Sequence, residues 1–591
     1  MLKRNEKLIR TKLLKYLVPA IMTNLALQAG NIVDTILVGN ILGTNAMSAV
    51  QIGGTVLLVI QIPGWMLGIG GSIVVGNCLG KRDLEGASKV FSSCLFAVLV
   101  SGAALMLCSV FSMPAATLLT AGKDLLTADV ASVVRVTFLG TPVIGICLLM
   151  MNIMAVDNNP AMATVYVVIS NVVNLIFDYV LLSYTDIGPA GSTVSTILGY
   201  GIALVVIPAY ARSPKRMLKL VNPVRKTGAY FRLALITGVP ALLSIICEMV
   251  RNSVMNVMIL RSTGENGAAV YTICLNIILI VELLIGGIIG AMEKIGGVIY
   301  GEKDYFGLRS ITKNILVYSY TMLAVLMLVL FLFSRQTAGM FGISDGDLLS
   351  ASQAALRIFF LALPGYVFNR FFISYYETTE HSGYANLITV LEYCGALLPA
   401  VFICSLIARM TGADTLNFMM CGLVAGEFIT AAVTMLVVKM RGRGEGILLL
   451  PERDEEVLDF SVAPDLAETS FIPREIIGFC KGKVEKTRAN QMAVAAEEMA
   501  VNTIRYGGRS LKSIDVMLSV SDDGLVLRQR DDGIPFDPTD YTFDSGPYEY
   551  GGIEAIRALT DRITYLRILD LNNTTLEISA QKKEEGSEGA L

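Results

Sequence analysis

Three polar side chains lie inside strongly apolar stretches of the sequence. Asp34 lies near the end of residues 13–38, and Asn174 and Asp178 lie four residues apart in SNVVNLIFDYVLL, so one helix face presents both. An ionisable group in a membrane helix is costly and usually faces a cavity or a partner. Two carboxylates and a carboxamide could bind Na⁺ through oxygen atoms, or hold a proton, because burial and mutual repulsion disfavour the charged carboxylate. The alternative is that the two acids lie at the membrane edge or only assist packing.

Glu248 is a second candidate, because Arg251 follows it three residues later in another apolar run. The pair could form a second site for an ion or a cationic substrate, or it could be a local ion pair that holds one helix. The sequence leaves both interpretations open. Other charged residues in or near apolar runs cannot be ranked from the sequence: Glu282, Glu293, Lys294, Arg357, Arg370, Glu392 and Glu427.

The last 150 or so residues carry a third set of polar side chains. In AVAAEEMAVNTIRYGG, Glu498 and Asn502 share a helix face, where a carboxylate could orient water and a carboxamide oxygen could bind Mg²⁺. Asp531 precedes a glycine turn in RDDGIPFDP. GPYEYGG at 546–552 is a glycine-bearing loop before the predicted helix IEAIRALTDRI at 553–563, whose N-terminus could hold phosphate. Singly these patterns are weak, since a solvated helix face or an ordinary turn would look the same.

The elements that position the first two sets are expected to be membrane helices. Of the 591 residues, 54% are hydrophobic and only 16% are charged, far less charge than a soluble protein of this length carries. The first apolar run is too long for a signal peptide and predicts a membrane helix. Twelve apolar runs are long enough to cross a bilayer: 13–38, 47–79, 90–111, 130–154, 161–183, 189–210, 232–260, 268–299, 312–333, 353–376, 384–408 and 416–439.

Positive charge predicts the orientation of these helices. The segments before the first run and after the even-numbered runs hold twenty Lys and Arg residues, and the opposite loops hold four. Loops rich in Lys and Arg remain in the cytoplasm. We therefore expect a multi-pass protein of the plasma membrane, the inner membrane of a bacterium, with both termini and the soluble tail in the cytoplasm.

The apolar part contains an internal repeat with one constant offset. LVPAIM at Pro19 matches GVPALL at Pro240, and GKRDLEG at 80–86 matches GEKDYFG at 301–307, the same distance further along the chain. Two anchors with one offset predict two six-helix pseudo-symmetric halves in the same orientation, with a substrate cleft between them. The predicted organisation is a first half at 1–210, a cytoplasmic linker at 211–230, a second half at 231–440, a linker at 441–453 and a cytoplasmic domain at 454–591.

The tail is expected to fold as an α+β sandwich. VLDFSVAP predicts a strand, residues 465–483 and 487–507 predict helices, IDVMLSVSDDGLVLRQRDDG predicts two strands joined by a DDG turn, and TTLEIS predicts a last strand. Because His381 is the only histidine, a histidine-based metal site or catalytic triad is excluded. The ten cysteines lack CxxC or paired spacing, which is typical of small buried side chains.

The first 440 residues resemble the MATE family of multidrug and toxin extrusion antiporters. The resemblance rests on six segments: NIVDTILVG at 31–39, PGWMLGIGGSIVVGNCLGKRD at 63–83, NVVNLIFDYVL at 171–181, GPAGSTVSTIL at 188–198, GVPALLSIICE at 238–248 and IGGVIYGEKDY at 295–305. It implies export of cationic amphiphilic compounds in exchange for Na⁺ or H⁺. By the same resemblance, the residues of ion coupling are Asp34, Asn174, Asp178, Thr196 and Glu248.

Residues 455–580 resemble the GHKL (Bergerat-type) ATP-binding fold, in particular its anti-sigma-factor serine-kinase-like branch. The resemblance implies ATP and Mg²⁺ as cofactors, with Glu498 as general base and Asn502 as the Mg²⁺ ligand. It implies further nucleotide-binding roles for Asp531 at the adenine amino group, Gly533 in the pocket, Gly551 and Gly552 in the phosphate lid, and Thr575 at adenine.

Two departures from the GHKL pattern favour ATP binding over efficient phosphoryl transfer. Tyr506 replaces a common histidine, and Tyr550 occupies the first glycine of the usual lid motif. Because no phospho-acceptor histidine is present, a complete histidine kinase is not expected.

The predicted function is therefore cation-coupled export of a small molecule, with a cytoplasmic ATP-binding domain as regulator. The expected partners are the substrate, the lipid bilayer and a cytoplasmic regulatory protein, and no nucleic acid. One alternative is a membrane sensor whose tail acts as an anti-sigma-like serine kinase or switch. A second alternative is a flippase for a lipid-linked substrate, against which the two acids Asp34 and Asp178 speak.

Overall fold

The structure is a computed structural model that describes residues 4–42, 44–120, 124–222, 228–340, 346–442, 446–450, 457–540 and 551–579. Within these ranges, only the backbone is described for residues 26–40, 42, 44–48, 51, 55, 124–126, 256, 265, 266, 268, 269, 272, 338–340, 346–348 and 551. The chain separates into two compact units. Residues 15–449 form the helical unit, and residues 1–14 together with 450–591 form the sheet unit.

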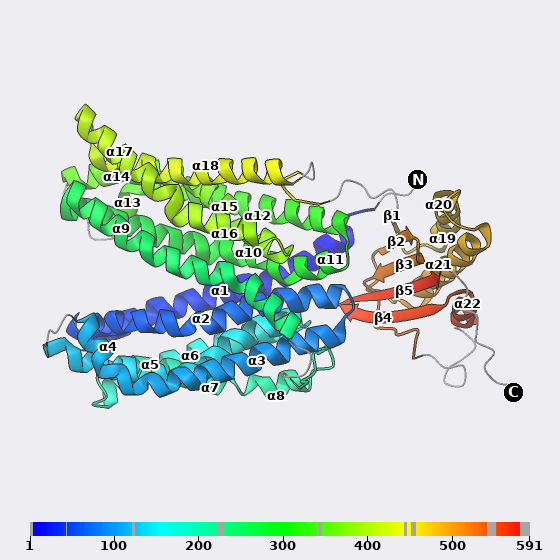
Figure 1. Cartoon of the computed structure of the whole chain (residues 1–591), viewed down its shortest axis with the longest axis horizontal. Coiled ribbons are helices and arrows are strands. Elements are labelled where there is room, and N and C mark those ends of the chain that lie inside the picture. Colours follow the sequence, from blue (N-terminus) through cyan, green and yellow to red (C-terminus); the bar gives the residue numbers. More distant parts are fainter. Residues whose placement is uncertain are drawn as a thin grey trace. The chain divides into compact units, whose positions relative to one another are not determined.

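The helical unit consists of long helices that run side by side (Figure 1). The helices that precede the basic segment predicted as a linker are α1 (Lys7–Leu42), α2 (Thr44–Gly80), α3 (Leu84–Leu107), η1 (Cys108–Phe111), α4 (Ser112–Leu119), α5 (Asp124–Val156), α6 (Pro160–Tyr184), α7 (Ala190–Ala203) and α8 (Val206–Ala211). Then follow α9 (Gly228–Val281), η2 (Glu282–Gly286), α10 (Gly287–Ala291), η3 (Met292–Gly296), α11 (Gly297–Gly301), α12 (Tyr305–Leu332), α13 (Ser334–Met340), α14 (Gly346–Phe360), α15 (Leu363–Thr378), α16 (Ser382–Val390), η4 (Leu391–Gly395), α17 (Leu397–Thr411) and α18 (Thr415–Arg441).

Eleven helical segments within the described residues are long and apolar enough to cross a membrane. They run from Ile52–Gly80 to Thr415–Arg441 and coincide with the second to twelfth predicted runs. The first predicted run, 13–38, lies within α1 and is not among the eleven. The long helix α9 contains the predicted run 232–260 and the start of the next run, 268–299, and it is broken between them at Gly264, where φ is 71°.

Three short π-helical segments interrupt the later helices. They are η2, η3 and η4, and each contains one glutamate: Glu282, Glu293 and Glu392 respectively. π-Helical turns inside α-helices are rare and frequently lie at functional sites. The three glutamates therefore stand out among the charged residues that the sequence leaves unranked.

Two capping turns of the helical unit are alike and occupy equivalent positions of the internal repeat. Asp83 caps α3 by accepting a hydrogen bond from the Gly86 N–H over 2.7 Å, and Asp304 caps α12 through the Gly307 N–H over 2.8 Å. The residue before each aspartate has a positive φ, 61° in the first turn and 56° in the second. The sequence match between 80–86 and 301–307 is thus accompanied by the same local structure.

The helices that lead into these turns, α2 and α11, are in very close contact. A Cβ atom on Gly80 would lie 2.0 Å from the Val298 carbonyl oxygen, and a Cβ atom on Gly301 would lie 2.2 Å from that of Asn77. Positions 77 and 80 are equivalent to 298 and 301 in the internal repeat, so each helix offers the same glycine to the same position of the other. A larger side chain at either glycine would push the two helices apart.

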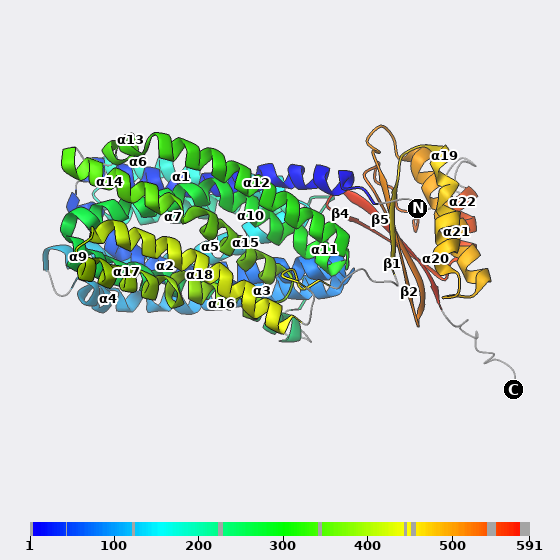
Figure 2. The same cartoon turned by 90° about the horizontal axis from the view of Figure 1, so that it is seen from above.

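The sheet unit contains five antiparallel strands in the order β1-β2-β3-β5-β4. The strands are β1 (Val457–Val462), β2 (Ile514–Ser521), β3 (Gly524–Asp531), β4 (Arg562–Ile568) and β5 (Leu571–Ser579). The helices α19 (Leu466–Thr469), α20 (Phe471–Cys480), α21 (Lys486–Tyr506) and α22 (Gly551–Leu559) lie on one face of the sheet (Figure 2). Alternate strand residues such as Phe460, Val516 and Leu527 form the core with these helices.

One strand of the sheet was not predicted. The predicted helix after residue 552 continues to Ile563, but α22 ends at Leu559 and β4 begins at Arg562. The segment RITYLRI pairs with β5, Thr564 opposite Thr575. Pairing with β5 outweighs the helical pattern that extends from α22, because the strand gains a full ladder of backbone hydrogen bonds.

The opposite face of the sheet contacts the first residues of the chain. Arg4 forms two 2.9 Å hydrogen bonds to the Asp459 carboxylate and lies 3.5 Å from that of Asp515, and its side chain is 4% exposed. The Asn5 N–H donates to the Ser461 hydroxyl over 3.0 Å. These partners lie on β1 and β2. The predicted first half, 1–210, thus begins with a segment that packs with the tail.

Candidate functional site

Tight packing between α6 and α7 positions the first polar site. At Gly199 a Cβ atom would lie 2.4 Å from the Ser170 carbonyl oxygen and 3.1 Å from the Asn174 Cβ atom, so only glycine allows this approach. The contact sets the preceding turn of α7, with Ser195 and Thr196, against the polar face of α6. We call Asn174, Asp178, Ser195 and Thr196 the α6–α7 site.

The four side chains of the α6–α7 site contact one another. The Asn174 amide donates to the Thr196 hydroxyl over 3.2 Å and to the Ser195 hydroxyl over 3.3 Å. The Ser195 hydroxyl in turn hydrogen-bonds Asp178, whose side chain is fully buried. The site therefore combines one carboxylate with one amide and two hydroxyls, all of which carry oxygen atoms suited to Na⁺, and the carboxylate could instead hold a proton.

The structure brings together three of the five predicted ion-coupling residues, namely Asn174, Asp178 and Thr196. Asp34 belongs to α1, but its side chain lies outside the described residues. Glu248 lies on α9 and is half exposed, and it pairs with Arg251 over 3.5 Å. Ser195 was missed, because a serine in a membrane helix usually bonds its own helix, as Ser195 also does with the Ser192 carbonyl at 2.7 Å.

A second polar group surrounds Arg370 on α15. Its guanidinium lies 2.9 Å from the Glu282 carboxylate of η2 and 3.1 Å from the Tyr393 hydroxyl of η4. Glu282 also accepts a hydrogen bond from the Tyr366 hydroxyl. Arg251 lies over the Tyr393 ring, 4.8 Å from its centroid. Together with Glu248, Glu392 and Glu427 these residues form the Arg370 cluster, which draws side chains from five helical elements.

A third group is centred on Lys294 of η3. Its ammonium donates to the side-chain amide oxygen of Asn152 over 2.7 Å and lies 3.4 Å from the Ser72 hydroxyl and 3.5 Å from the Glu293 carboxylate. Asn152 and Ser72 come from α5 and α2. A lysine that is almost buried among membrane helices is costly, and these oxygen atoms stabilise its charge.

The predicted nucleotide site of the tail has a buried carboxylate at its centre. Asp531, at the end of β3, is 3% exposed. Its Oδ1 accepts hydrogen bonds from the Gly533 N–H over 2.9 Å and from the Asn572 amide over 2.8 Å. Both bonds go to one oxygen, so the other is available to a ligand in the cavity that Asp531 lines. That cavity measures about 20 Å³ and must open to admit a nucleotide.

Burial raises the pKa of Asp531 to about 6, although the bonds from Asn572 and Gly533 act in the opposite direction. The carboxylate charge is thus available at neutral pH and is lost under mildly acidic conditions. A charged acceptor in a poorly solvated place is suited to an amino group that donates a hydrogen bond.

Glu498 and Asn502 lie beside the first turn of α22. A Cβ atom on Gly552 would lie 2.6 Å from the Glu498 carboxylate and 2.9 Å from the Asn502 amide nitrogen, so only glycine fits there. Asn502 is 5% exposed, and its Nδ2 has no hydrogen-bond partner among the described residues. Gly551 begins α22, but its surroundings lie outside the described side chains. The predicted lid glycine and the predicted catalytic pair are therefore neighbours.

The prediction for Thr575 is corrected by one residue. Asp531 and Gln529 face the helices, and their partners on β5 are Asn572 and Thr574. Thr574 lines the cavity, whereas Thr575 lies on the other face of the sheet, opposite Arg528. Successive strand residues point to opposite faces, so an error of one position changes the face. Asn572, which orients Asp531, was not predicted, since a single Asn in a strand carries no recognisable signal.

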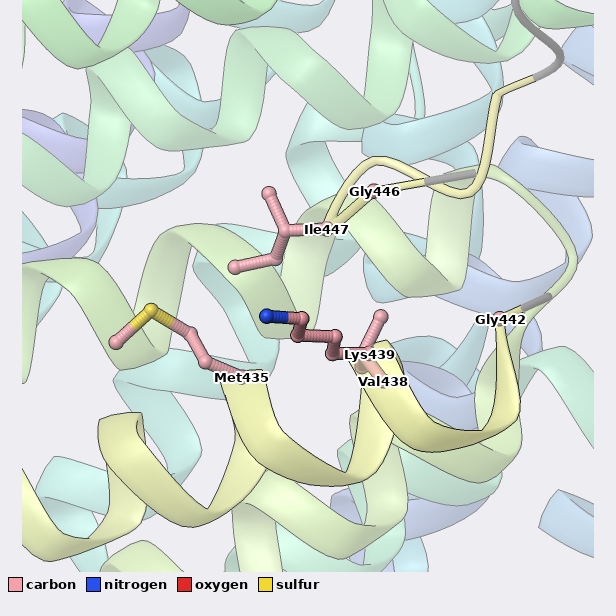
Figure 3. A pocket seen from close by; sticks show the side chains of 6 residues that line it. All are labelled: Met435, Val438, Lys439, Gly442, Gly446 and Ile447. Atoms are coloured by element: carbon pink, nitrogen blue, oxygen red, sulfur yellow. The ribbon is translucent and has the colours of Figure 1, made fainter. Parts of the chain in front are cut away.

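A larger cavity, of about 340 Å³, lies where α18 meets the linker that follows it (Figure 3). Met435, Val438 and Ile447 line it, and the Lys439 side chain extends between Met435 and Ile447. The Tyr375 and Tyr376 hydroxyls donate to the linker carbonyls of Leu448 and Ile447, each over 2.7 Å. None of the predicted site residues lines this cavity.

Two family models match the chain. Residues 19–180 and 240–403, together more than half of the chain, match the MatE family, and residues 474–579 match the histidine kinase-like ATPase domain. The multidrug export protein MepA of Staphylococcus saprophyticus is 21% identical over 428 residues, which cover 72% of this chain and 92% of that protein. The probable multidrug resistance protein YoeA of Bacillus subtilis is 21% identical over 404 residues, 66% of this chain and 86% of that protein.

Solved structures show the same fold. An outward-facing multidrug resistance MATE family transporter of the MOP superfamily matches with a TM-score of 0.67 and 19% identity, over 75% of this chain and 97% of that one. A MOP superfamily transporter from Pyrococcus furiosus, described as having a binding pocket of reverse polarity, matches with a TM-score of 0.65 and 20% identity, over 73% and 96%. The chain is thus a multi-pass membrane protein of the MatE family that also carries a histidine kinase-like ATPase domain.

Proposed function

We propose that this protein is a Na⁺- or H⁺-coupled antiporter that exports small cationic amphiphilic compounds by alternating access, and that its ATPase-like domain regulates export. The α6–α7 site carries the proposal. It holds a fully buried carboxylate, Asp178, among neutral oxygen-bearing side chains, as a site for an exchangeable cation requires. The names of the relatives MepA and YoeA, a multidrug export protein and a probable multidrug resistance protein, support the choice of substrate class.

Helix geometry supports Asp34 as a further member of the ion site. The Thr23 and Thr164 hydroxyls lie 2.9 Å apart, and Thr164 also hydrogen-bonds the Pro19 carbonyl at 3.1 Å, so α1 contacts α6 there. If both helices leave the cytoplasmic side, residue 34 lies about 16 Å beyond Thr23 and Asn174 about 15 Å beyond Thr164. Asp34 is then at the depth of Asn174.

Alternating access is supported by the internal repeat. We propose twelve membrane helices, α1 and the eleven described spans, in two six-helix halves. The matching caps at Asp83 and Asp304 and the reciprocal contacts of Gly80 and Gly301 support this arrangement. The distribution of Lys and Arg in the loops supports cytoplasmic termini in the plasma membrane.

Transport by the full chain in proteoliposomes tests the antiport proposal. A cationic dye such as ethidium is loaded, and a Na⁺ gradient and a pH gradient are applied separately. Asp178→Asn and Asp34→Asn are each expected to reduce gradient-driven export to the level of protein-free liposomes. Glu85→Gln, which changes a 76% exposed carboxylate on α3, is the matched control. Undiminished export by Asp178→Asn, or no export by the wild-type chain under either gradient, would contradict the proposal.

For the tail we propose that the cavity at Asp531 binds the adenine of ATP. The unpaired Asn502 amide and the Glu498 carboxylate fit a nucleotide with Mg²⁺, because the Asn502 oxygen would bind the metal and Glu498 would orient water. The metal would neutralise phosphate charge. Gly552 lets the lid approach both side chains.

Contacts of the N-terminal segment support a regulatory role. Lys12, on the first helix, donates to the Asp570 carbonyl of the β4–β5 turn over 2.9 Å. Asn572, two residues further on, holds Asp531 in the proposed adenine pocket. Nucleotide binding at Asp531 can therefore alter the position of the turn, and the turn contacts α1 through Lys12. We propose that the tail acts on α1 through Lys12 and Arg4.

The regulatory proposal is tested by adding ATP on the tail side during transport. Asp531→Ala is expected to abolish ATP binding, whereas Arg4→Ala is expected to keep ATP binding and lose the effect of ATP on export. Lys7→Ala changes an exposed residue of the same segment and serves as the control. The regulatory role is refuted if export is the same with and without ATP in the wild-type chain.

A serine-kinase switch is the second candidate for the tail, favoured by the position of Glu498 beside the lid glycine. It predicts phosphorylation of a cytoplasmic partner protein that Glu498→Ala abolishes while ATP binding persists. Phosphorylation that survives Glu498→Ala would remove this candidate.

A further inference from the structure

We infer that Glu392 is a proton-binding site in the membrane, separate from the α6–α7 site. The role of this proton in transport rests on the proposed ion-coupled antiport. The evidence that Glu392 binds a proton does not depend on that proposal. Glu392 lies on the π-helical segment η4 and is 1% exposed. Neither of its carboxyl oxygens has a hydrogen-bond partner among the described residues. A carboxylate that is buried without a donor is very unstable, so Glu392 carries a proton in this conformation.

The cations near Glu392 are engaged with other groups. Arg370 and Arg251 are its strongest positive neighbours, and Glu282 and Glu248 are negative ones. Arg370 binds Glu282 at 2.9 Å and Tyr393 at 3.1 Å, and Arg251 pairs with Glu248 at 3.5 Å. The positive charges therefore act on Glu392 only at a distance, and none donates a hydrogen bond to it in the described structure.

A second buried acid, Glu427, also favours a protonated Glu392. Glu427 on α18 is 6% exposed, and Glu392 is the charged group that acts on it most strongly. Glu427 also accepts a 2.8 Å hydrogen bond from the Asn369 amide. Two carboxylates in one desolvated place cannot both be ionised. Glu392, whose oxygens have no donor among the described residues, therefore holds a proton.

The chemistry favours a proton over a metal cation at this place. Na⁺ requires several oxygen ligands, whereas the proton requires only the carboxyl group itself. The guanidinium groups of Arg370 and Arg251 also repel a metal cation. When the cluster opens to water, the carboxyl O–H bond breaks, the proton passes to water, and Arg370 and Arg251 stabilise the carboxylate that remains. Refolding of the π-helical turn is a natural way to expose it.

Infrared spectroscopy on the solubilised full chain tests the proton directly. The carbonyl stretch of protonated carboxyl groups is expected in the wild-type spectrum at neutral pH. In Glu392→Gln the intensity of this band is expected to be lower by the contribution of one carboxyl group. Glu85→Gln is expected to leave the band unchanged, and Glu392→Asp, which keeps a carboxyl group, to retain a shifted band. Size-exclusion chromatography confirms folding. An unchanged band in Glu392→Gln overturns the inference.

Proton release on substrate binding tests the purpose of the site. With a pH-indicator dye and ethidium as substrate, Glu392→Gln is expected to release about one proton fewer per chain than the wild-type protein. Equal release overturns the coupling role of Glu392. If the wild-type chain transports under neither gradient, the proposed function fails, while the infrared band still decides whether Glu392 holds a proton.

Discussion

The α6–α7 site and the Arg370 cluster differ in the groups that stabilise their carboxylates. In the α6–α7 site, the neutral hydroxyls of Ser195 and Thr196 are among the groups that contact Asp178 and Asn174. In the Arg370 cluster, a fixed guanidinium binds Glu282 at 2.9 Å. The first arrangement is suited to a cation that enters and leaves. In the second, the protein supplies the cation itself, and only protons can vary the charge.

The largest effect is expected where one fixed charge of the Arg370 cluster is removed. Arg370→Met leaves Glu282 without its cationic partner and is expected to lower the free energy of unfolding by about 3–5 kcal/mol. The double variant Arg370→Met/Glu282→Gln is expected to recover most of this loss, because no uncompensated charge remains. Thermal unfolding in detergent measures both. If the double variant is as unstable as Arg370→Met, the unpaired charge of Glu282 is not the cause of the lost stability.

Closer to the α6–α7 site, the contact at Gly199 is expected to have an intermediate effect. Gly199→Ala places a methyl group 2.4 Å from the Ser170 carbonyl oxygen and is expected to cost about 1–3 kcal/mol of stability. It should also weaken ion-driven export by moving Thr196 away from Asn174. Gly201→Ala is the matched control on the same helix, since its Cβ atom would meet only Val143, at 3.9 Å. Equal stability of both variants would show that the approach of α6 and α7 is not tight.

Asp531 of the sheet unit is a third buried carboxylate, and neutral groups hydrogen-bond it. Asp531 has a pKa of about 6, so the carboxyl group gains a proton and loses its charge as the pH falls through that value. If the charged form binds the adenine amino group, nucleotide affinity is expected to fall about tenfold between pH 7 and pH 5. Calorimetry with ADP measures the affinity. Asp531→Asn should bind weakly at both pH values, and an equally steep dependence in that variant would assign the titration to another group.

The smallest effect is expected at Ser195. Ser195→Ala removes the hydroxyl that contacts Asp178 and is expected to cost about 1 kcal/mol of stability. The coupling-ion concentration for half-maximal export should rise. Ser253→Ala is the control, because this exposed serine hydrogen-bonds the Met249 carbonyl of its own helix. An unchanged ion dependence in Ser195→Ala would limit the site to the residues that the sequence predicted.

Local patterns predicted most of the membrane helices and two of the four residues of the α6–α7 site. Asn174 and Asp178 are four residues apart on one helix, so their common face follows from helix geometry alone. Thr196 was predicted from the family resemblance. Its contact with Asn174 requires the close approach of α6 and α7 at Gly199, and the sequence alone does not show that this glycine lies between the two helices. In the tail, a position error of one residue at Thr575 was enough to choose the wrong face of β5.

Contacts between distant segments could not be predicted. Arg4 and Asp459 are 455 residues apart, and no spacing rule connects them. The Arg370 cluster likewise joins α9, η2, α15, η4 and α18, whose charged residues the sequence could not rank. The partners of a buried charge depend on which helices pack together, and hydrophobic patterning specifies the faces of helices but not their neighbours.

The contact between Arg4 and the tail has a consequence for biosynthesis. The first residues leave the ribosome some 455 positions before Asp459, which at about 5–20 residues per second means a delay of about 20–90 s. During this time the basic start of the chain lacks its acidic partners, and the membrane helices can insert first. The Arg4 contact can therefore close only after the sheet unit has been synthesised.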